Sequence, residues 1–315
     1  TAANFLAEVQ REVETGYDNR VLNEPKLILK RAAPILIERL ANLSAADRAA
    51  VLKQLQEEVA NRNLMLYFKD IDLQTYFEDL GAGGEVLDLS RSSPGEYLAV
   101  VSANVGGGKS DAFIERHFQF STVIRSDGTA DNYLNAKLAH TGENQRDSWY
   151  RAANRSYLQV FTPAGSHLDF GGGFDTKAPA AFSASAPAGF ERDADIERIE
   201  RTAQPLQNGA LEQLASFDKT VFAGWVTVPA GDTKMLELRY RNPQRVPLGL
   251  SPLPYRIIIE RQSGAPASFD LLAETPAGYH WRESGTPLYN YVSDSLPGRT
   301  VLDLTIEPDQ AAAAC

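Results

Sequence analysis

Residues 116–128 read RHFQFSTVIRSDG, and residues 132–140 read NYLNAKLAH. Apolar and polar side chains alternate in both stretches, which is the pattern of a strand with one buried and one exposed face. The Asp127-Gly128 pair between them is a strong signal for a tight turn. Together they predict a pair of neighbouring antiparallel strands, and the rest of the chain up to residue 308 follows the same style.

Two further hairpins are predicted around Pro-Ala-Gly turns, because Pro and Gly are residues that tight turns favour. The stretches are RSYLQVFTPAGSHLDF (155–170) and KTVFAGWVTVPAGDTKMLELRY (219–240). Short strands separated by Gly and Pro predict an antiparallel β-sandwich over residues 116–308, Ig-like in style. Within it, residues 171–215 are expected to form a long polar loop, and residues 309–315 form a tail.

Residues 1–103 are mainly helical in pattern. Apolar residues recur at helical spacing in ANFLAEVQREVE (3–14) and SAADRAAVLKQLQEEVANR (44–62), and a short helix is expected over 71–81. Short strands are expected at NLMLYF (63–68) and EYLAVVSA (96–103). The overall fold class is therefore α+β, with a helical α/β segment that ends a larger upstream domain. A Gly-rich connection over residues 104–115 joins this segment to the sandwich.

The composition narrows the functional classes. The chain has 315 residues and a formal net charge of −10, so its surface repels nucleic acids and anionic lipid. Its single cysteine, Cys315, allows no internal disulfide and no cysteine-based zinc site. We predict no cofactor and no metal. Because the chain begins with Thr1, we expect a longer protein whose targeting segment lies upstream.

Residues 103–110, ANVGGGKS, fit a loose form of the phosphate-binding loop. Such a loop joins a buried strand to the N-terminus of a long helix, whose free amides bind the anion. The following DAFIERHFQF (111–120) allows only one or two helical turns before alternation begins. The sequence therefore favours a turn, with Lys109 as a possible contact for a glycan or for an anion other than a nucleotide.

No catalytic residue is identified. The acidic residues clustered in 70–79 and 191–195 are better interpreted as solvated faces than as a carboxylate pair for glycoside hydrolysis. Tryptophan rings can stack on sugars, although in a β-sandwich they more often fill the core. Arg116 and Trp281 are the remaining possible ligand contacts.

Two neighbouring stretches also resemble a known family. NLMLYFKDIDLQTYFEDLGAGGEV (63–86), followed by YLAVVSANVGGGKSDAFIERHFQF (97–120), resembles the bacterial cell-envelope proteins grouped as domain of unknown function 4012. The resemblance covers most of residues 1–262, although Gly108 stands where the family usually has Asn. The family's turn motif is carried by Asn104, Gly106, Gly107, Lys109, Ser110 and Asp111.

The resemblance implies an outward-facing bacterial envelope protein that is held at the membrane by an upstream anchor. We expect a non-enzymatic extracytoplasmic module that binds cell-surface glycan, the cell wall or another protein, in an undetermined oligomeric state. The alternative is part of a glycopolymer transferase-like enzyme that acts on polyprenyl-pyrophosphate-linked glycan and needs its upstream half. Nucleotide binding at residues 103–110 is the third hypothesis.

Overall fold

A computed structural model describes residues 4–24, 26–89, 94–105, 108–177, 189 and 191–309. The chain divides into two compact units, residues 1–58 and residues 59–315. Cys315 lies outside the described residues.

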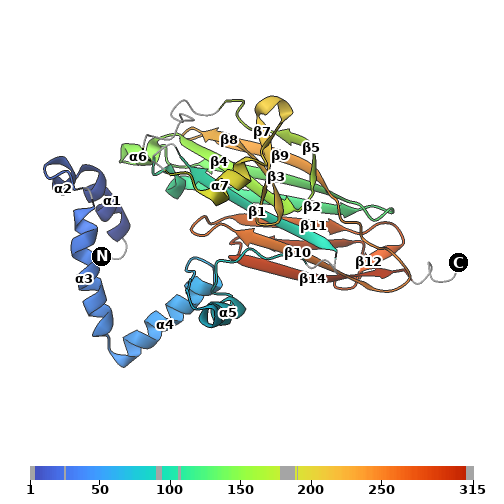
Figure 1. Cartoon of the computed structure of the whole chain (residues 1–315), viewed down its shortest axis with the longest axis horizontal. Coiled ribbons are helices and arrows are strands. Elements are labelled where there is room, and N and C mark those ends of the chain that lie inside the picture. Colours follow the sequence, from blue (N-terminus) through green and yellow to red (C-terminus); the bar gives the residue numbers. More distant parts are fainter. Residues whose placement is uncertain are drawn as a thin grey trace. The chain divides into compact units, whose positions relative to one another are not determined.

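The first unit is helical, as the sequence predicts (Figure 1). It contains α1 (Phe5–Thr15), α2 (Tyr17–Arg20), α3 (Leu27–Ala41) and most of α4 (Ala45–Ala60). Among the described residues, no side chain of α1, α3 or α4 is buried. Several apolar side chains of these helices are exposed to solvent, as Leu6 and Ile37 illustrate with exposed fractions of 74% and 67%.

The second unit contains two β-sheets (Figure 1). The larger has the order β12-β14-β10-β1-β4-β8-β7-β6, and the smaller has the order β13-β11-β2-β3-β9-β5. The bounds of the eight are β1 (Gly95–Asn104), β4 (Asn154–Pro163), β6 (Gln204–Leu206), β7 (Leu211–Ser216), β8 (Lys219–Val228), β10 (Leu253–Arg261), β12 (Tyr279–Trp281) and β14 (Arg299–Pro308). The bounds of the six are β2 (Ile114–Ile124), β3 (Ala130–His140), β5 (His167–Gly172), β9 (Thr233–Asn242), β11 (Ser268–Glu274) and β13 (Leu288–Ser293).

The predicted β2–β3 hairpin is confirmed. The two strands pair antiparallel along their whole length, and Arg125 N–H donates to Thr129 O at 2.8 Å to close the turn. Gly128 has a φ of 81°, and a Cβ there would lie 2.2 Å from Val246 O. Only glycine fits both the left-handed backbone and this close approach.

The two Pro-Ala-Gly turns do not form hairpins. β4 and β8 belong to the eight-stranded sheet, whereas β5 and β9, the strands that follow them, belong to the six-stranded sheet. Each turn therefore carries the chain from one sheet to the other. The turn residues correctly predicted that the chain reverses direction. They do not indicate whether the next strand joins the same sheet or the opposite one.

The expected antiparallel sandwich is also wrong in one respect, because both sheets are mixed. β1 runs parallel to β10, with Leu98 opposite Ile259, and β2 runs parallel to β11, with Phe120 opposite Leu271. The other pairings between strands are antiparallel. Alternation identifies a strand but not its neighbour, so partners far apart in sequence cannot be assigned from the pattern.

The element boundaries differ from those expected in three places. β1 lies inside the eight-stranded sheet between β10 and β4, so the β-rich part begins at Gly95 and not at residue 116. NLMLYF (63–68) forms no strand, whereas the predicted short helix is α5 (Ile71–Asp79). The expected loop 171–215 contains α7 (Ala194–Glu200), β6, the 3-10 turn η2 (Gln207–Gly209) and most of β7.

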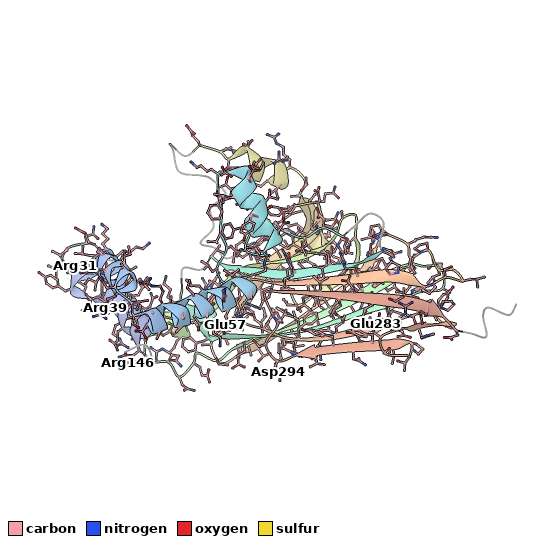
Figure 2. All side chains as sticks on the ribbon, turned by 90° about the horizontal axis from the view of Figure 1, so that it is seen from below. Arg31, Arg39, Glu57, Arg146, Glu283 and Asp294 are labelled. Carbon is pink, nitrogen blue, oxygen red and sulfur yellow. The ribbon has the colours of Figure 1, made fainter. Side chains whose placement is uncertain are left out.

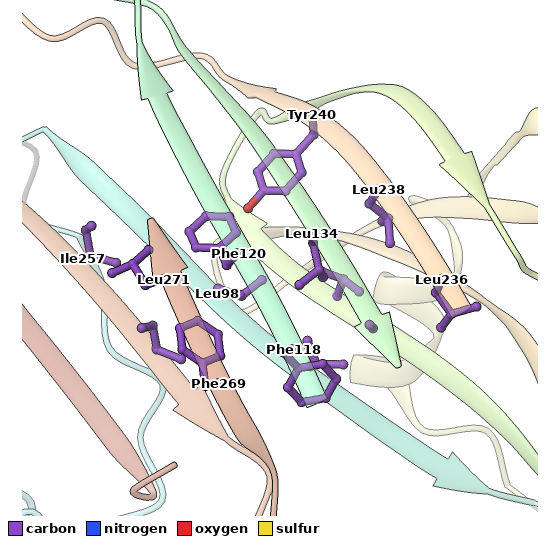
Figure 3. Packing of buried hydrophobic residues seen from close by; sticks show 14 of the residues in the cluster. Leu98, Phe118, Phe120, Leu134, Leu236, Leu238, Tyr240, Ile257, Phe269 and Leu271 are labelled. Atoms are coloured by element: carbon purple, nitrogen blue, oxygen red, sulfur yellow. The ribbon is translucent and has the colours of Figure 1, made fainter. Parts of the chain in front are cut away.

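Inward side chains of both sheets meet in one apolar core (Figure 3). Leu98 and Ile257 come from the eight-stranded sheet, whereas Phe118, Phe120 and Leu134 come from the six-stranded sheet. Each of these side chains is at least 94% buried. Burial of one such side chain contributes about 1.5–3 kcal/mol, so this core holds the two sheets together.

A buried carboxyl group interrupts the apolar core. Glu96 on β1 is fully buried; its Oε1 accepts hydrogen bonds from Asn242 Nδ2 at 3.0 Å and from Tyr255 OH at 3.3 Å. Its Oε2 has no protein partner among the described residues, and neither has the hydroxyl of Tyr240. Burial raises the pKa of Glu96 to about 7, and the hydrogen bonds only partly offset this.

Glu96 is therefore expected to make the fold less stable at alkaline pH. The folded-state pKa of about 7 lies above the ordinary 4.5, so this contribution to stability is complete below pH 4.5 and is lost as the pH rises through 7. The loss at high pH approaches about 3 kcal/mol. Glu96→Gln stays neutral, so urea unfolding between pH 5 and pH 8.5 should show a flatter dependence than the wild type. The exposed control Glu115→Gln should follow the wild type, and an unchanged slope for Glu96→Gln would contradict the assignment.

Candidate functional site

The predicted motif turn follows β1 directly. Gly106 and Gly107 lie outside the described residues. The backbone N–H of Lys109 donates at 3.1 Å to the carbonyl oxygen of Trp149, which lies in α6 (Ser148–Arg151). The chain then makes the 3-10 turn η1 (Ser110–Phe113) and enters β2 at Ile114. No long helix follows the glycines, so the described part of this stretch lacks the geometry of a phosphate-binding loop.

The polar side chains of the motif tie the turn to β4. Ser110 is fully buried, and its Oγ accepts from Asn154 Nδ2 at 3.3 Å and from Asn104 Nδ2 at 3.4 Å. Asn154 Nδ2 also lies 3.0 Å from Asp111 Oδ1, and Ser156 Oγ donates to Asn154 Oδ1 at 2.7 Å. These contacts explain why small polar residues occupy the turn without invoking a ligand.

Arg116 also belongs to this structural cluster. Its side chain is only 8% exposed; it lies 3.3 Å from Asp111 Oδ1 and donates to Ile114 O at 2.9 Å. Burial lowers the pKa of Arg116, and the charge of Asp111 opposes that effect. Arg116, a possible ligand contact from the sequence, is therefore engaged within the turn and leaves little of its side chain open to a ligand.

Trp281 is not an exposed sugar-stacking residue either. Its side chain is fully buried, its Nε1 donates to Ala273 O at 3.0 Å, and its ring packs 5.6 Å from that of Tyr255. The more usual role of tryptophan in a β-sheet protein, filling the core, is the one observed.

A groove that the sequence did not reveal lies on the outer face of the eight-stranded sheet. Residues 86–89 pack there against the buried cluster formed by Tyr97, Ala99 and Ile258. The groove has a volume of about 350 Å³ between this segment and the sheet. Its lining consists of Arg62, Met65, Gly84, Val86, Tyr97, Ala99, Val101, Gln159, Phe161, Phe217, Glu260, Arg261 and Gln262.

An ion-pair network fixes one end of the groove. Arg299 on β14 donates through Nε to Glu260 Oε1 at 2.6 Å and through NH1 to Glu85 Oε1 at 2.8 Å. Arg62 NH2 and Arg299 NH2 both donate to Glu85 O, at 2.9 and 2.7 Å. Tyr97 OH donates to Glu260 Oε2 at 2.5 Å. Two guanidinium groups and two carboxylates, with the Tyr97 hydroxyl, thus connect residues 61–89, which we call the covering segment, to β1, β10 and β14.

The pKa values of Glu85 and Tyr97 favour the protonation states that the hydrogen bonds of this network require. Although burial opposes it, hydrogen bonding to Arg299 and the charges of Arg299 and Arg62 keep the pKa of Glu85 below its usual range. Burial, followed by the hydrogen bond to Glu260, raises the pKa of Tyr97 well above its usual range. Glu85 therefore stays charged and Tyr97 stays a neutral donor at neutral pH.

Arg261 adds positive charge to the rim of the groove. Its hydrogen bonds go to neutral oxygens, which include Leu296 O, Gln262 O and Asn61 O, each at 2.9 Å. These bonds also hold Asn61 against the end of β10.

No set of three or more His, Cys, Asp or Glu side chains in the described residues is arranged to hold a metal. None of the described helices is long and apolar enough to cross a membrane.

Comparison with known proteins leaves the family open. No protein-family model matches the chain, and no curated protein matches it. A crystal structure from Legionella pneumophila subsp. pneumophila, provisionally named as a nutrient binding protein, is 13% identical to this chain. The match covers 68% of this chain and 72% of the other, with a TM-score of 0.35. A likeness at that level supports no conclusion about fold or ligand.

The motif turn yields a stability prediction. Asp111→Ala leaves Arg116 without its carboxylate, so we expect a loss of about 1–3 kcal/mol in the free energy of unfolding, towards the lower end because Asp111 is 43% exposed. Lys109→Ala keeps the backbone N–H that bonds to Trp149, so we expect a smaller loss than for Asp111→Ala. Urea unfolding of both variants measures the difference, and a larger loss for Lys109→Ala would contradict the structural interpretation of the turn.

The ion-pair network yields a second prediction. Arg299→Met removes the bonds that join Glu85 to Glu260, so the covering segment should open more often. Hydrogen exchange at Leu66 N–H, which donates to Ala82 O at 2.8 Å, should become about tenfold faster or more. Exchange in the β2–β3 hairpin should stay unchanged.

Arg256→Met is the matched control for this experiment, because Arg256 on β10 pairs with the exposed Asp303. It should leave exchange at Leu66 as in the wild type. Equal exchange in the two variants would show that Arg299 does not hold the segment.

Proposed function

We propose that this chain is an interaction module of a bacterial cell-envelope protein in the family of domain of unknown function 4012. The resemblance over residues 63–86 and 97–120 supports the family, and the family supports a place outside the cytoplasm. The family also supports a membrane anchor upstream of these residues. The module itself acts by binding and not by catalysis.

Among the ligands that the sequence leaves open, the groove favours another protein. A second hollow of about 320 Å³ shares Met65 and Gly84 with the groove and extends to Tyr67. Apolar side chains continue beyond it onto α5, where Ile71 is 78% exposed; Tyr67 itself is 79% exposed. Exposed apolar patches on soluble proteins often mark interaction sites.

The residue types on this surface point in the same direction. Tyrosine, methionine and arginine are enriched in the centres of protein interfaces, and here Met65 lines the groove together with Arg62 and Arg261, while Tyr67 lines the adjoining hollow. The network around Arg299 orders the groove before a partner arrives, which lowers the entropy lost on binding. The exposed apolar surface from the groove to α5 is the observation that carries the proposal.

Site-specific crosslinking tests this function. A photoreactive phenylalanine derivative replaces Tyr67 in the full-length protein in its own bacterium, and illumination should give a discrete covalent adduct with a second protein. The same substitution at Glu283, an exposed side chain (Figure 2), is the control and should give none. No adduct at position 67, or the same adduct at both positions, would overturn the proposal.

The partner class is tested in the same samples. Mass spectrometry of the adduct identifies the second chain, and a different protein supports the proposal. An adduct between two copies of this chain would replace it with self-association. The transferase-like alternative stays a prediction that requires residues beyond this chain.

A further inference from the structure

The outer face of the six-stranded sheet carries a second, shallow groove of about 320 Å³. It crosses β3, β2, β11 and β13, which belong to the sheet that the covering segment does not contact. The outward side chains that line it are Gln119, Ser121, Asn135, Asp270, Leu272 and Asn290, with Val292 at the edge.

Strand register places these side chains in two adjacent rows. In one row Gln119 lies opposite both Asn135 and Asp270. In the other, Leu272 lies opposite both Ser121 and Asn290. Neighbouring strands are about 4.8 Å apart, so a row across four strands is roughly 14 Å long. That length matches a short extended chain and exceeds a single small molecule.

The three amides of the groove are open to a ligand. Gln119, Asn135 and Asn290 are exposed, and within the described residues their side chains make no hydrogen bond to protein. In contrast, Asp270 is paired, with its Oδ2 3.4 Å from His117 Nε2. Each amide offers two donor hydrogens and a carbonyl acceptor at the same place.

This chemistry selects the ligand. A glycan carries dense hydroxyl groups, each of which donates and accepts, so it can satisfy amides that need both kinds of partner. Leu272 and the 68% exposed Val292 supply apolar surface for the C–H faces of a sugar ring. The six lining side chains include no Tyr, Trp, Met or Arg, unlike the centre of a protein interface. Asp270 and the net charge of −10 disfavour a polyanion.

We infer that the amide groove on the outer face of the six-stranded sheet binds an uncharged glycan chain. This goes beyond the proposed protein contact, since it concerns another sheet and another ligand class. One chain thus has two binding faces, an apolar one for a protein and a polar one for a glycan.

Titration with defined oligosaccharides tests the inference. The probes are three neutral hexasaccharides, namely chitohexaose, cellohexaose and mannohexaose, together with the acidic hexamer of galacturonic acid. We expect at least one neutral probe to bind the wild-type chain in calorimetry, and the acidic hexamer to bind more weakly. The triple variant Gln119→Ala/Asn135→Ala/Asn290→Ala should bind that neutral probe about tenfold more weakly or worse.

A matched variant controls for the loss of amides in general. Gln54→Ala/Gln56→Ala/Asn144→Ala removes three exposed amides elsewhere and should bind like the wild type. Thermal unfolding of both triple variants checks that the fold is kept. Binding to none of the neutral probes, stronger binding of the acidic hexamer, or equal binding by the amide-groove variant would each overturn the inference.

The outcome is separable from that of the proposed function. Crosslinking at position 67 tests the apolar surface beside the eight-stranded sheet. The triple amide-groove variant should still form the same adduct at that position. If the amide-groove variant lost both the adduct and glycan binding, the two faces would not be independent. That result would overturn the assignment of two sites.

Discussion

The fold depends on one strand, β1, which hydrogen-bonds to β10 on one side and to β4 on the other. Its first six residues are buried on both faces of the sheet. Inward, Leu98 and Val100 contribute to the core between the sheets. Outward, Tyr97 and Ala99 form the floor of the groove. The same ten residues therefore set the core, the groove and the starting point of the motif turn.

The two outer faces of the molecule differ because only one of them is covered. The covering segment contacts the eight-stranded sheet through Arg62 and residues 85–89, and there Arg62, Glu85, Glu260 and Arg299 form one hydrogen-bonded network. The outer face of the six-stranded sheet carries neutral amides that have no such commitment. Charged groups that must be partly buried need fixed partners, whereas exposed amides remain solvated and exchange water for a ligand at little expense.

Local sequence patterns predicted the local structure well. The helices α1 and α4, the short helix α5 and the β2–β3 hairpin follow from spacing and turn residues alone. What failed depended on distant partners. NLMLYF (63–68) has the composition of a strand but finds no neighbour to pair with, and Pro-Ala-Gly reversals lead across the core. The network around Arg299 joins residues from opposite ends of the unit, so no motif in the sequence marks it.

The parallel pairs have a consequence for how the protein reaches this fold. Tyr97 and its partner Glu260 are 163 residues apart, and His117 and Ser268 are 151 apart. Ordering such long loops is slow, because the entropy of closing them is lost before the contacts form. Until β10 and β11 have been synthesised, β1 and β2 each present an unpaired, apolar strand edge. During synthesis the chain is therefore prone to aggregate until β10 and β11 are available. Folding of the two sheets is completed only after these late strands have paired with β1 and β2.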